Sequence, residues 1–283
     1  MSEKVINGKA IYSPKGAAKE YGRVGCNFYT GCPHNCSYCY LKRGVTANTL
    51  GKTEVTLKKC FRDEQHALRE FNKELMRDLD YIKQTGIFFS FSTDPLIEQT
   101  RNLTLSVAHG AIRIGVPVKI LTKDADWESW LNRVQYISDD GKKLMAFGFT
   151  LTGCDDMEPG APSNRERIEA MRKMHQAGHP TFASIEPVID VKKSVEMIRQ
   201  TSEFCDLYLI GLRSGVKKDY YRRDDIGYLY SEVMIEHDYR SKHDFKVYWK
   251  ESVRKFFKDN KWEFLNKSYF VESDYNMFNQ NNE

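Results

Sequence analysis

The feature that most constrains the fold is an alternation of short apolar runs with longer amphipathic segments. Six apolar runs have the length of buried strands, and they lie at residues 25–30, 86–92, 118–122, 144–150, 181–186 and 207–211. Helical spacing of apolar residues occupies the intervals, at residues 59–83, 99–114, 127–137, 164–177 and 191–202. Because right-handed crossovers join successive parallel strands, this order predicts an α/β fold, either a doubly wound sheet or an incomplete, open TIM-like barrel.

A cysteine-rich loop follows the first predicted strand. Cys32, Cys36 and Cys39 lie in the segment YTGCPHNCSYCY, and Cys26 lies just upstream. In both architectures the loops at the carboxyl ends of the strands form the ligand site. We therefore expect these cysteines at the site where chemistry is done.

The sequence also indicates a compartment. The N-terminal stretch contains no apolar segment typical of a signal peptide, and no run of eighteen apolar residues follows it. We therefore expect a cytoplasmic protein with no membrane partner. In that reducing compartment, clustered cysteines indicate metal or redox chemistry rather than disulfides.

The spacing of the three cysteines, C-x3-C-x2-C, leaves a coordination position open. A structural zinc site needs four ligands, whereas a [4Fe-4S] cluster held by three thiolates has one iron free to chelate a small molecule. Two alternatives stay open: a zinc site with Cys26 or His34 as the fourth ligand, and cysteines with no shared role. We expect Cys26 in the core, inside the first strand.

The CxxxCxxC motif, with Tyr38 immediately before the third cysteine, resembles the signature of radical S-adenosylmethionine (SAM) enzymes. The resemblance implies a partial (β/α)6 TIM-like barrel of parallel strands, a [4Fe-4S] cluster on Cys32, Cys36 and Cys39, and reductive cleavage of SAM to a 5′-deoxyadenosyl radical. Four ordered segments, NFYTGCPHNCSYCYLKR, FSTDPL, VKILTKD and EPGAPSNRERIEAMRKMHQAG, resemble the spore photoproduct lyase-like branch, also called DNA repair photolyase-like. This likeness covers roughly residues 8–190.

The resemblance also implies contacts to the methionine part of SAM. Thr93 and Asp94, after the second strand, would hold the amine, and Lys123, after the third, would face the carboxylate. Arg167 would add a second cation near that carboxylate. The alternative for each is a turn residue or a solvated helix residue.

Two further residues are implied at the nucleoside part of SAM. Tyr38 would lie against the adenine, and Thr150 would reach the ribose. Glu186, at the end of the fifth predicted strand, is a weaker candidate for the substrate side of the site.

One departure from the family bears on the reaction. In the lyase, a cysteine close to the Asp94-type motif returns hydrogen to the product radical, but this chain has Ser90, Phe91 and Ser92 at that place. Cys154, after the fourth strand, is a candidate replacement, and a structural role is its alternative. We expect no chemical role for Cys60 or Cys205, so repair of thymine lesions does not follow from the scaffold.

The C-terminal part carries the excess positive charge. The net charge of the chain is +4. Residues 213–267 contain 14 Lys and Arg against 10 Asp and Glu, and the rest of the chain contains 29 basic and 29 acidic residues, so the whole excess lies in this segment. Mixed with aromatic residues, these bases suggest a nucleic-acid surface, with a solvated face as the alternative. We divide the chain into a barrel at 1–215, an α/β extension at 216–270 that packs on it and supplies a candidate seventh strand, and a disordered tail at 271–283.

Three functions are compatible with these patterns. The first is a radical SAM enzyme acting on nucleic acid, the second is one acting on a protein, peptide or small metabolite, and the third is a non-enzymatic metal-binding module. The C-terminal part resembles the radical SAM mobile pair proteins, which implies a second radical SAM polypeptide as partner. The resemblance also implies an electron donor such as flavodoxin or ferredoxin.

Overall fold

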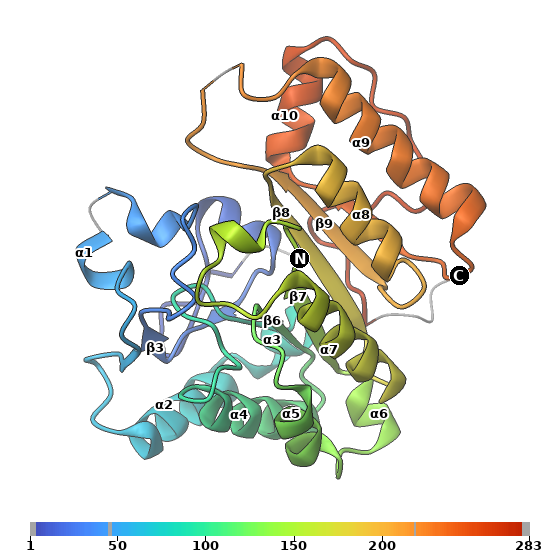
Figure 1. Ribbon diagram of the computed structural model, residues 1–283. Helices are drawn as coiled ribbons and strands as arrows, with labels where there is room; N and C mark the ends of the chain where they lie inside the picture. The colour runs from blue at the N-terminus through green and yellow to red at the C-terminus, as the bar shows by residue number, and fades with distance from the viewer. Residues whose placement is uncertain (1–3, 45–46, 218, 279–283) are drawn as a thin grey trace.

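The computed structural model describes residues 4–44, 47–217 and 219–278 and contains a curved eight-stranded sheet (Figure 1). The strand order is β1-β2-β5-β6-β7-β8-β9-β10, and every neighbouring pair is parallel except β1 with β2. The strands are β1 (Ile11–Tyr12), β2 (Gly25–Cys26), β5 (Ile87–Phe89), β6 (Val118–Thr122), β7 (Met145–Thr150), β8 (Thr181–Val188), β9 (Leu207–Leu212) and β10 (Lys246–Trp249).

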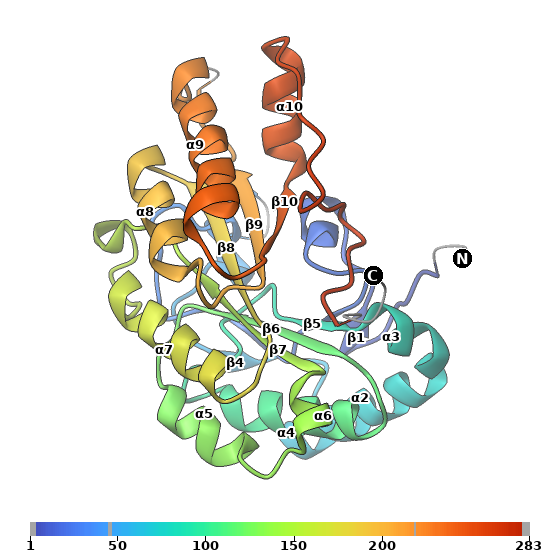
Figure 2. The same ribbon diagram turned by 90° about the vertical axis from the view of Figure 1, so that its right-hand side faces the viewer.

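Helices cover the outer face of this sheet (Figures 1 and 2). They are α2 (Glu64–Arg77), α3 (Leu79–Thr85), α4 (Arg101–Arg113), α5 (Trp127–Val134), α6 (Asp139–Lys142), α7 (Asn164–Gln176), α8 (Val191–Thr201), α9 (Arg223–Ile235) and α10 (Glu251–Asp259). The predicted partial TIM-like barrel is confirmed, and β10 adds a seventh parallel strand to the six expected. No helix of the described residues is long and apolar enough to cross a membrane.

Two predicted elements are divided. The expected strand at 25–30 is interrupted at Asn27, whose side chain bonds Tyr12 and Phe91, and only β2 joins the main sheet. Its second half, β3 (Tyr29–Thr30), pairs instead with β4 (Thr56–Leu57) in a separate two-stranded sheet. The expected helix at 59–83 breaks at Asp78, which ends α2 and precedes α3.

The inside of the barrel has its own apolar cluster, distinct from the larger core under the helices. Side chains alternate along each strand, so one set faces the helices and the other faces the barrel axis. The inner cluster contains Phe88, Ala146, Phe182, Leu207, Leu209, Tyr248 and Met277. Gly148 admits the Phe182 ring, because a Cβ at Gly148 would lie 2.1 Å from the ring carbon Cζ.

The C-terminal segment closes the barrel at the amino ends of the strands. Met277 is 4% exposed within the inner cluster, and Val271 and Phe278 pack against that cluster. The prediction of a disordered tail at 271–283 is therefore wrong for residues 271–278, because Met277 and Phe278 supply apolar surface that the barrel buries; residues 279–283 lie outside the described part. In Figure 2 this segment runs down from α10 toward β1 and β5.

The extension at 216–270 completes the sheet rather than forming a basic, aromatic surface. Tyr230, Trp249 and Phe257 lie in the core, and Phe264 and Phe270 pack against it. Most of its bases form ion pairs with carboxylates, which include Arg222 with Asp225, Arg240 with Glu232, Lys246 with Asp244, Arg254 with Glu272, Lys255 with Asp259 and Lys267 with Asp238. The solvated-face alternative fits this region better than a nucleic-acid surface does.

Candidate active site at the carboxyl ends of the strands

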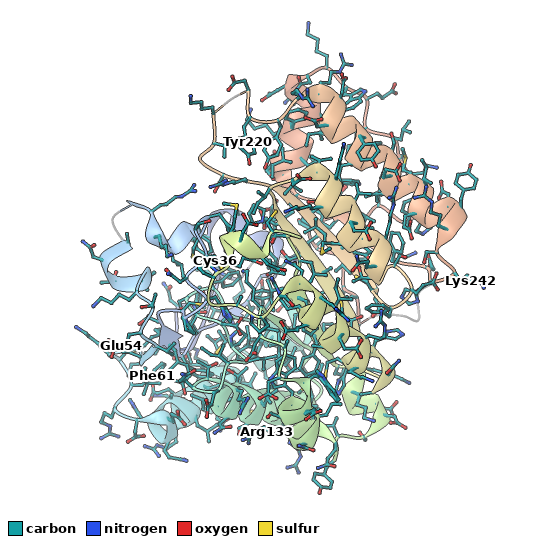
Figure 3. All side chains as sticks on the ribbon, in the orientation of Figure 1. Cys36, Glu54, Phe61, Arg133, Tyr220 and Lys242 are labelled. Atoms are coloured by element: carbon teal, nitrogen blue, oxygen red, sulfur yellow. The ribbon has the colours of Figure 1, made fainter. Side chains whose placement is uncertain are left out.

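A cavity of about 810 Å³ lies at the carboxyl ends of the strands. Glu186 and eight of the ten predicted site residues line it. The eight are Cys32, Cys36, Tyr38, Cys39, Thr93, Asp94, Lys123 and Thr150. Arg167 and Cys154 are not among the lining residues of the described chain. Figure 3 labels Cys36 on the loop beside the strand ends.

The cysteine loop is fixed by backbone hydrogen bonds to distant segments. Cys32 donates its N–H to the carbonyl of Lys52, and Ser37 donates to the carbonyl of Met157, both at 2.9 Å. Gly31 makes the turn into the loop with a φ of +86°, and a Cβ there would lie 1.9 Å from the carbonyl oxygen of Glu54. Glycine is therefore required where the loop leaves β3.

Two of the three thiols, those of Cys32 and Cys36, lie near the same cation. Burial raises the pKa of Cys32 to about 12 and also raises the pKa of Cys36. The nearby Lys123 ammonium offsets only part of this increase. Lys123 is the third-strand lysine that the sequence places at this site. Lys123 therefore places a positive charge beside Cys32 and Cys36 on the cavity wall.

His34 connects this loop to the end of the second barrel strand. Its Nε2 lies 2.8 Å from Oδ2 of Asp94, and its Nδ1 lies 3.1 Å from the carbonyl oxygen of Gly160. Burial lowers the pKa of His34, but the charge and hydrogen bond of Asp94 outweigh burial and raise it overall. Because both ring nitrogens are engaged, His34 is not free to be the fourth zinc ligand.

Asp94 is held by the protein as an ionised carboxylate. Besides His34, it accepts hydrogen bonds from the Thr122 hydroxyl and the Lys123 N–H at 2.7 Å and from the Leu96 N–H at 3.0 Å. Burial raises its pKa, but His34 and these hydrogen bonds bring it to about 2. Next to it, the hydroxyl of Thr93 is buried and has no hydrogen-bond partner among the described residues, so it is available to a ligand.

Arg167 supports Tyr38 instead of lining the cavity. Its Nη2 donates to Glu158, which also accepts from the Tyr38 hydroxyl, and its Nη1 donates to the carbonyl of Thr150 at 2.6 Å. The guanidinium is fully buried. Sequence reasoning missed Glu158, although it lies in the same segment as Arg167, because no spacing rule connects a carboxylate in a loop to a tyrosine 120 residues away.

The other cysteines lie apart from the cavity. Cys26 is buried in β2, as expected, and Cys205 is also buried, while Cys60 is exposed. Cys154 is buried in the loop after β7, and burial raises its pKa. The structure does not bring Cys154 to the cavity lining, so its role as hydrogen donor gains no support from the geometry.

A single-ion site is not formed by these side chains. Within the described ranges, no three His, Cys, Asp or Glu side chains converge on a position for one metal ion. Zinc requires such convergence, because its ligands surround one ion. In a [4Fe-4S] cluster each thiolate binds a different iron, so the three cysteines need no such convergence to hold a cluster.

Another part of the cavity wall carries charged residues that the sequence did not single out, apart from Glu186. Lys250, with 1% of its side chain exposed, lies 3.3 Å from Glu20 and 2.5 Å from Glu186. The Tyr21 hydroxyl contacts Glu186 at 2.5 Å and Ser184 at 2.8 Å. These contacts join the segment before β2 to the ends of β8 and β10.

Comparisons with known proteins fit this geometry. No family model matches the chain. An uncharacterized protein of Methanocaldococcus jannaschii is 26% identical over 192 residues, which cover 64% of this chain and 67% of that protein. A solved variant of spore photoproduct lyase superposes with a TM-score of 0.62 at 15% identity, over 83% of this chain and 78% of the lyase.

The chain has the fold of spore photoproduct lyase. That enzyme has also been solved in complex with dinucleoside spore photoproduct, at a TM-score of 0.60 and 15% identity, over 82% of this chain and 79% of the lyase. SuiB of Streptococcus suis, solved with bound S-adenosylmethionine, superposes at a TM-score of 0.51 and 13% identity, over 82% of this chain and 50% of SuiB. These similarities show the fold, and they confirm the partial barrel predicted from the sequence.

Proposed function

We propose that this protein is a radical SAM enzyme. The observation that carries the proposal is the common cavity: Cys32, Cys36 and Cys39 line it together with Lys123 and the unpartnered hydroxyl of Thr93. The three thiols would hold a [4Fe-4S] cluster, and SAM would bind in the same cavity. When bound, the cluster supplies the electron that splits SAM into methionine and a 5′-deoxyadenosyl radical.

The cavity residues would bind and orient the methionine part of SAM. Lys123 supplies a cation for the carboxylate, and the Thr93 hydroxyl and the Asp94 carboxylate supply acceptors for the amine. Asp94 would act on the amine mainly through its negative charge, because its oxygens already accept four hydrogen bonds; the one from His34 also holds the cysteine loop.

The remaining contacts would bind the nucleoside part of SAM. Tyr38 would lie against the adenine, held by Glu158 and Arg167, and Thr150 would meet the ribose. Arg167 thereby acts as a positioning residue instead of meeting the SAM carboxylate. The hydrogen donor to the product radical stays a prediction, as do the electron donor and the second radical SAM polypeptide.

Anaerobic reconstitution with iron and sulfide, followed by dithionite reduction and assay for 5′-deoxyadenosine, tests the reaction type. The wild-type protein should bind about four irons per chain and form 5′-deoxyadenosine. Cys36→Ala should lose both, and the matched control Cys60→Ala, at an exposed cysteine outside the cavity lining, should keep both. Equal losses in the two variants, or colourless wild-type protein loaded with zinc, would reject the proposal in favour of a metal-binding module.

We further propose that the substrate is a nucleic acid, on the strength of the cations around the cavity. Lys15, Lys42, Lys52 and Arg213 line it, and none pairs with a carboxylate of the described residues. Nε of Arg213 is a buried donor with no partner in the same part of the chain. A phosphate backbone meets such groups without a need for specific base contacts.

Salt dependence tests this assignment. If three or four of these cations contact phosphates, the affinity for a single-stranded oligonucleotide should fall about 20- to 50-fold between 50 and 200 mM salt. The affinity would instead stay unchanged if the cations do not contact phosphates. If 5′-deoxyadenosine formation then responds to peptides or metabolites and not to oligonucleotides, the substrate is a protein, peptide or small metabolite.

A further inference from the structure

The cavity wall formed by Glu20, Tyr21, Glu186 and Lys250, here called the Glu186 wall, is not used by the proposed SAM contacts. All four residues line the cavity. The ammonium of Lys250 lies between two carboxylates and 4.0 Å from the centre of the Tyr21 ring. Two carboxylates against one ammonium leave this wall with an excess of negative charge.

The two oxygens of Glu186 have different surroundings. Oε2 accepts from the Tyr21 hydroxyl and from the Lys250 ammonium, each at 2.5 Å. Oε1 accepts no hydrogen bond from the described residues. It lies over Gly211 of β9, where a Cβ would come within 2.5 Å of it, so the glycine makes room for the carboxylate.

The unbonded oxygen Oε1 of Glu186 determines which kind of ligand group can bind to it. A carboxylate oxygen is only an acceptor, and an excess of negative charge favours a donor or a cation. The four cations Lys15, Lys42, Lys52 and Arg213 line the same cavity and favour an anionic group. A nucleotide unit meets both demands, because it carries a phosphate and also N–H groups on its base.

We propose that Glu186 is a specificity-determining residue whose Oε1 accepts a hydrogen bond from an N–H group of a substrate nucleobase. This inference rests on the proposed nucleic-acid substrate. Glu186 then reads the base, while the cations hold the phosphate chain without reading sequence.

The substitution Glu186→Gln gives a sharp test, because the hydrogen bonds on Oε2 dictate how the amide sits. The position of Oε2 faces two donors, Tyr21 and Lys250, so the amide oxygen of glutamine must occupy it. The amide nitrogen then takes the position of Oε1. The substitution therefore replaces the free acceptor by a donor with little change in shape.

The probes are two fluorescently labelled single-stranded octamers, one of thymidine and one of N3-methylthymidine. Thymine has one N–H on its base edge, and methylation removes it. Dissociation constants are measured by fluorescence anisotropy with the anaerobically reconstituted protein and SAM. The matched control is Glu251→Gln, which removes the same charge from another residue of the cavity lining, one with an exposed side chain.

The wild-type protein should bind the thymidine octamer about tenfold more tightly than the methylated one. Glu186→Gln should abolish this preference, and Glu251→Gln should retain it. A preference that survives in Glu186→Gln reflects the bulk of the methyl group and would overturn the inference, as would equal binding of both octamers by the wild type.

The wild-type comparison keeps the inference testable even if Glu186→Gln does not fold, which circular dichroism would reveal. Equal and salt-sensitive binding of both octamers overturns the role of Glu186 and leaves the nucleic-acid substrate standing. Binding of neither octamer, with 5′-deoxyadenosine still formed, overturns the nucleic-acid substrate and the inference with it.

Discussion

Nε2 of His34 lies 2.8 Å from Oδ2 of Asp94, and both side chains are 5% exposed. This ion pair joins the cysteine loop to the end of the second barrel strand, so the loop is held in place by the protein itself. In the proposed function, this loop presents the thiols of Cys32, Cys36 and Cys39 to the cavity.

Asp94→Asn tests the contribution of this pair to stability. The substitution leaves a buried histidine without its counter-charge, so the free energy of unfolding should fall by about 3 to 5 kcal/mol. Urea unfolding of the apoprotein measures it. Asp140→Asn, at an exposed aspartate paired with Lys143, is the control and should change stability by less than about 0.5 kcal/mol. Equal effects would mean that the pair does not fix the loop.

Arg167→Met tests the supporting role assigned to this arginine. The substitution leaves Glu158, whose side chain is 1% exposed, without its cation, and we expect a loss of about 3 to 5 kcal/mol in urea unfolding. Arg172→Met, on the same helix with a side chain 41% exposed, should cost less than about 0.5 kcal/mol. A small effect of Arg167→Met would indicate that its ion pair is dispensable.

Two glycines should respond in opposite directions to alanine. Gly148→Ala places a methyl group 2.1 Å from the Phe182 ring and should lower the free energy of unfolding by about 1 to 3 kcal/mol. Gly110→Ala, inside α4 with no atom within 4 Å of the new Cβ, should raise it by about 0.5 to 1 kcal/mol. Thermal and urea unfolding of the pair check both signs, and destabilisation by both would contradict the packing described.

Met277→Ala tests the closure of the barrel by the C-terminal segment. Removal of this side chain from the inner cluster should cost about 2 to 5 kcal/mol. Met76→Ala, at a methionine that is 61% exposed, is the matched control and should be nearly neutral. If both variants unfold at the same denaturant concentration as the wild type, the segment does not contribute to the fold.

Much of the fold was predictable because buried parallel strands have a clear sequence pattern. The runs at 118–122, 144–150, 181–186 and 207–211 all became strands, since each is a short apolar stretch between helical patterns. The break at Asn27 was not predictable, because it depends on hydrogen bonds to Tyr12 and Phe91 that only the folded chain creates. The C-terminal segment was misjudged because its few apolar residues find partners in distant strands.

The candidate site was predictable only in part. The cysteines, Tyr38, Thr93, Asp94, Lys123 and Thr150 follow strand ends or a recognisable motif, and the fold brings them together. Arg167 carries the positive charge expected for a contact to the SAM carboxylate, but it forms an ion pair with Glu158. The spacing of the two residues in the sequence does not reveal this ion pair. Lys250 lies at the end of the seventh strand, and its pairing with Glu186, 64 residues away, appears only in three dimensions.

The central claim is that three cysteines hold a [4Fe-4S] cluster with one iron left open for SAM. Electron paramagnetic resonance of the reduced, reconstituted protein, recorded before and after addition of SAM, tests it most directly. The account predicts a cluster signal that changes when SAM is added, in the wild type and in Cys60→Ala but not in Cys36→Ala. A wild-type signal that SAM leaves unchanged, or the absence of any cluster signal, would contradict it.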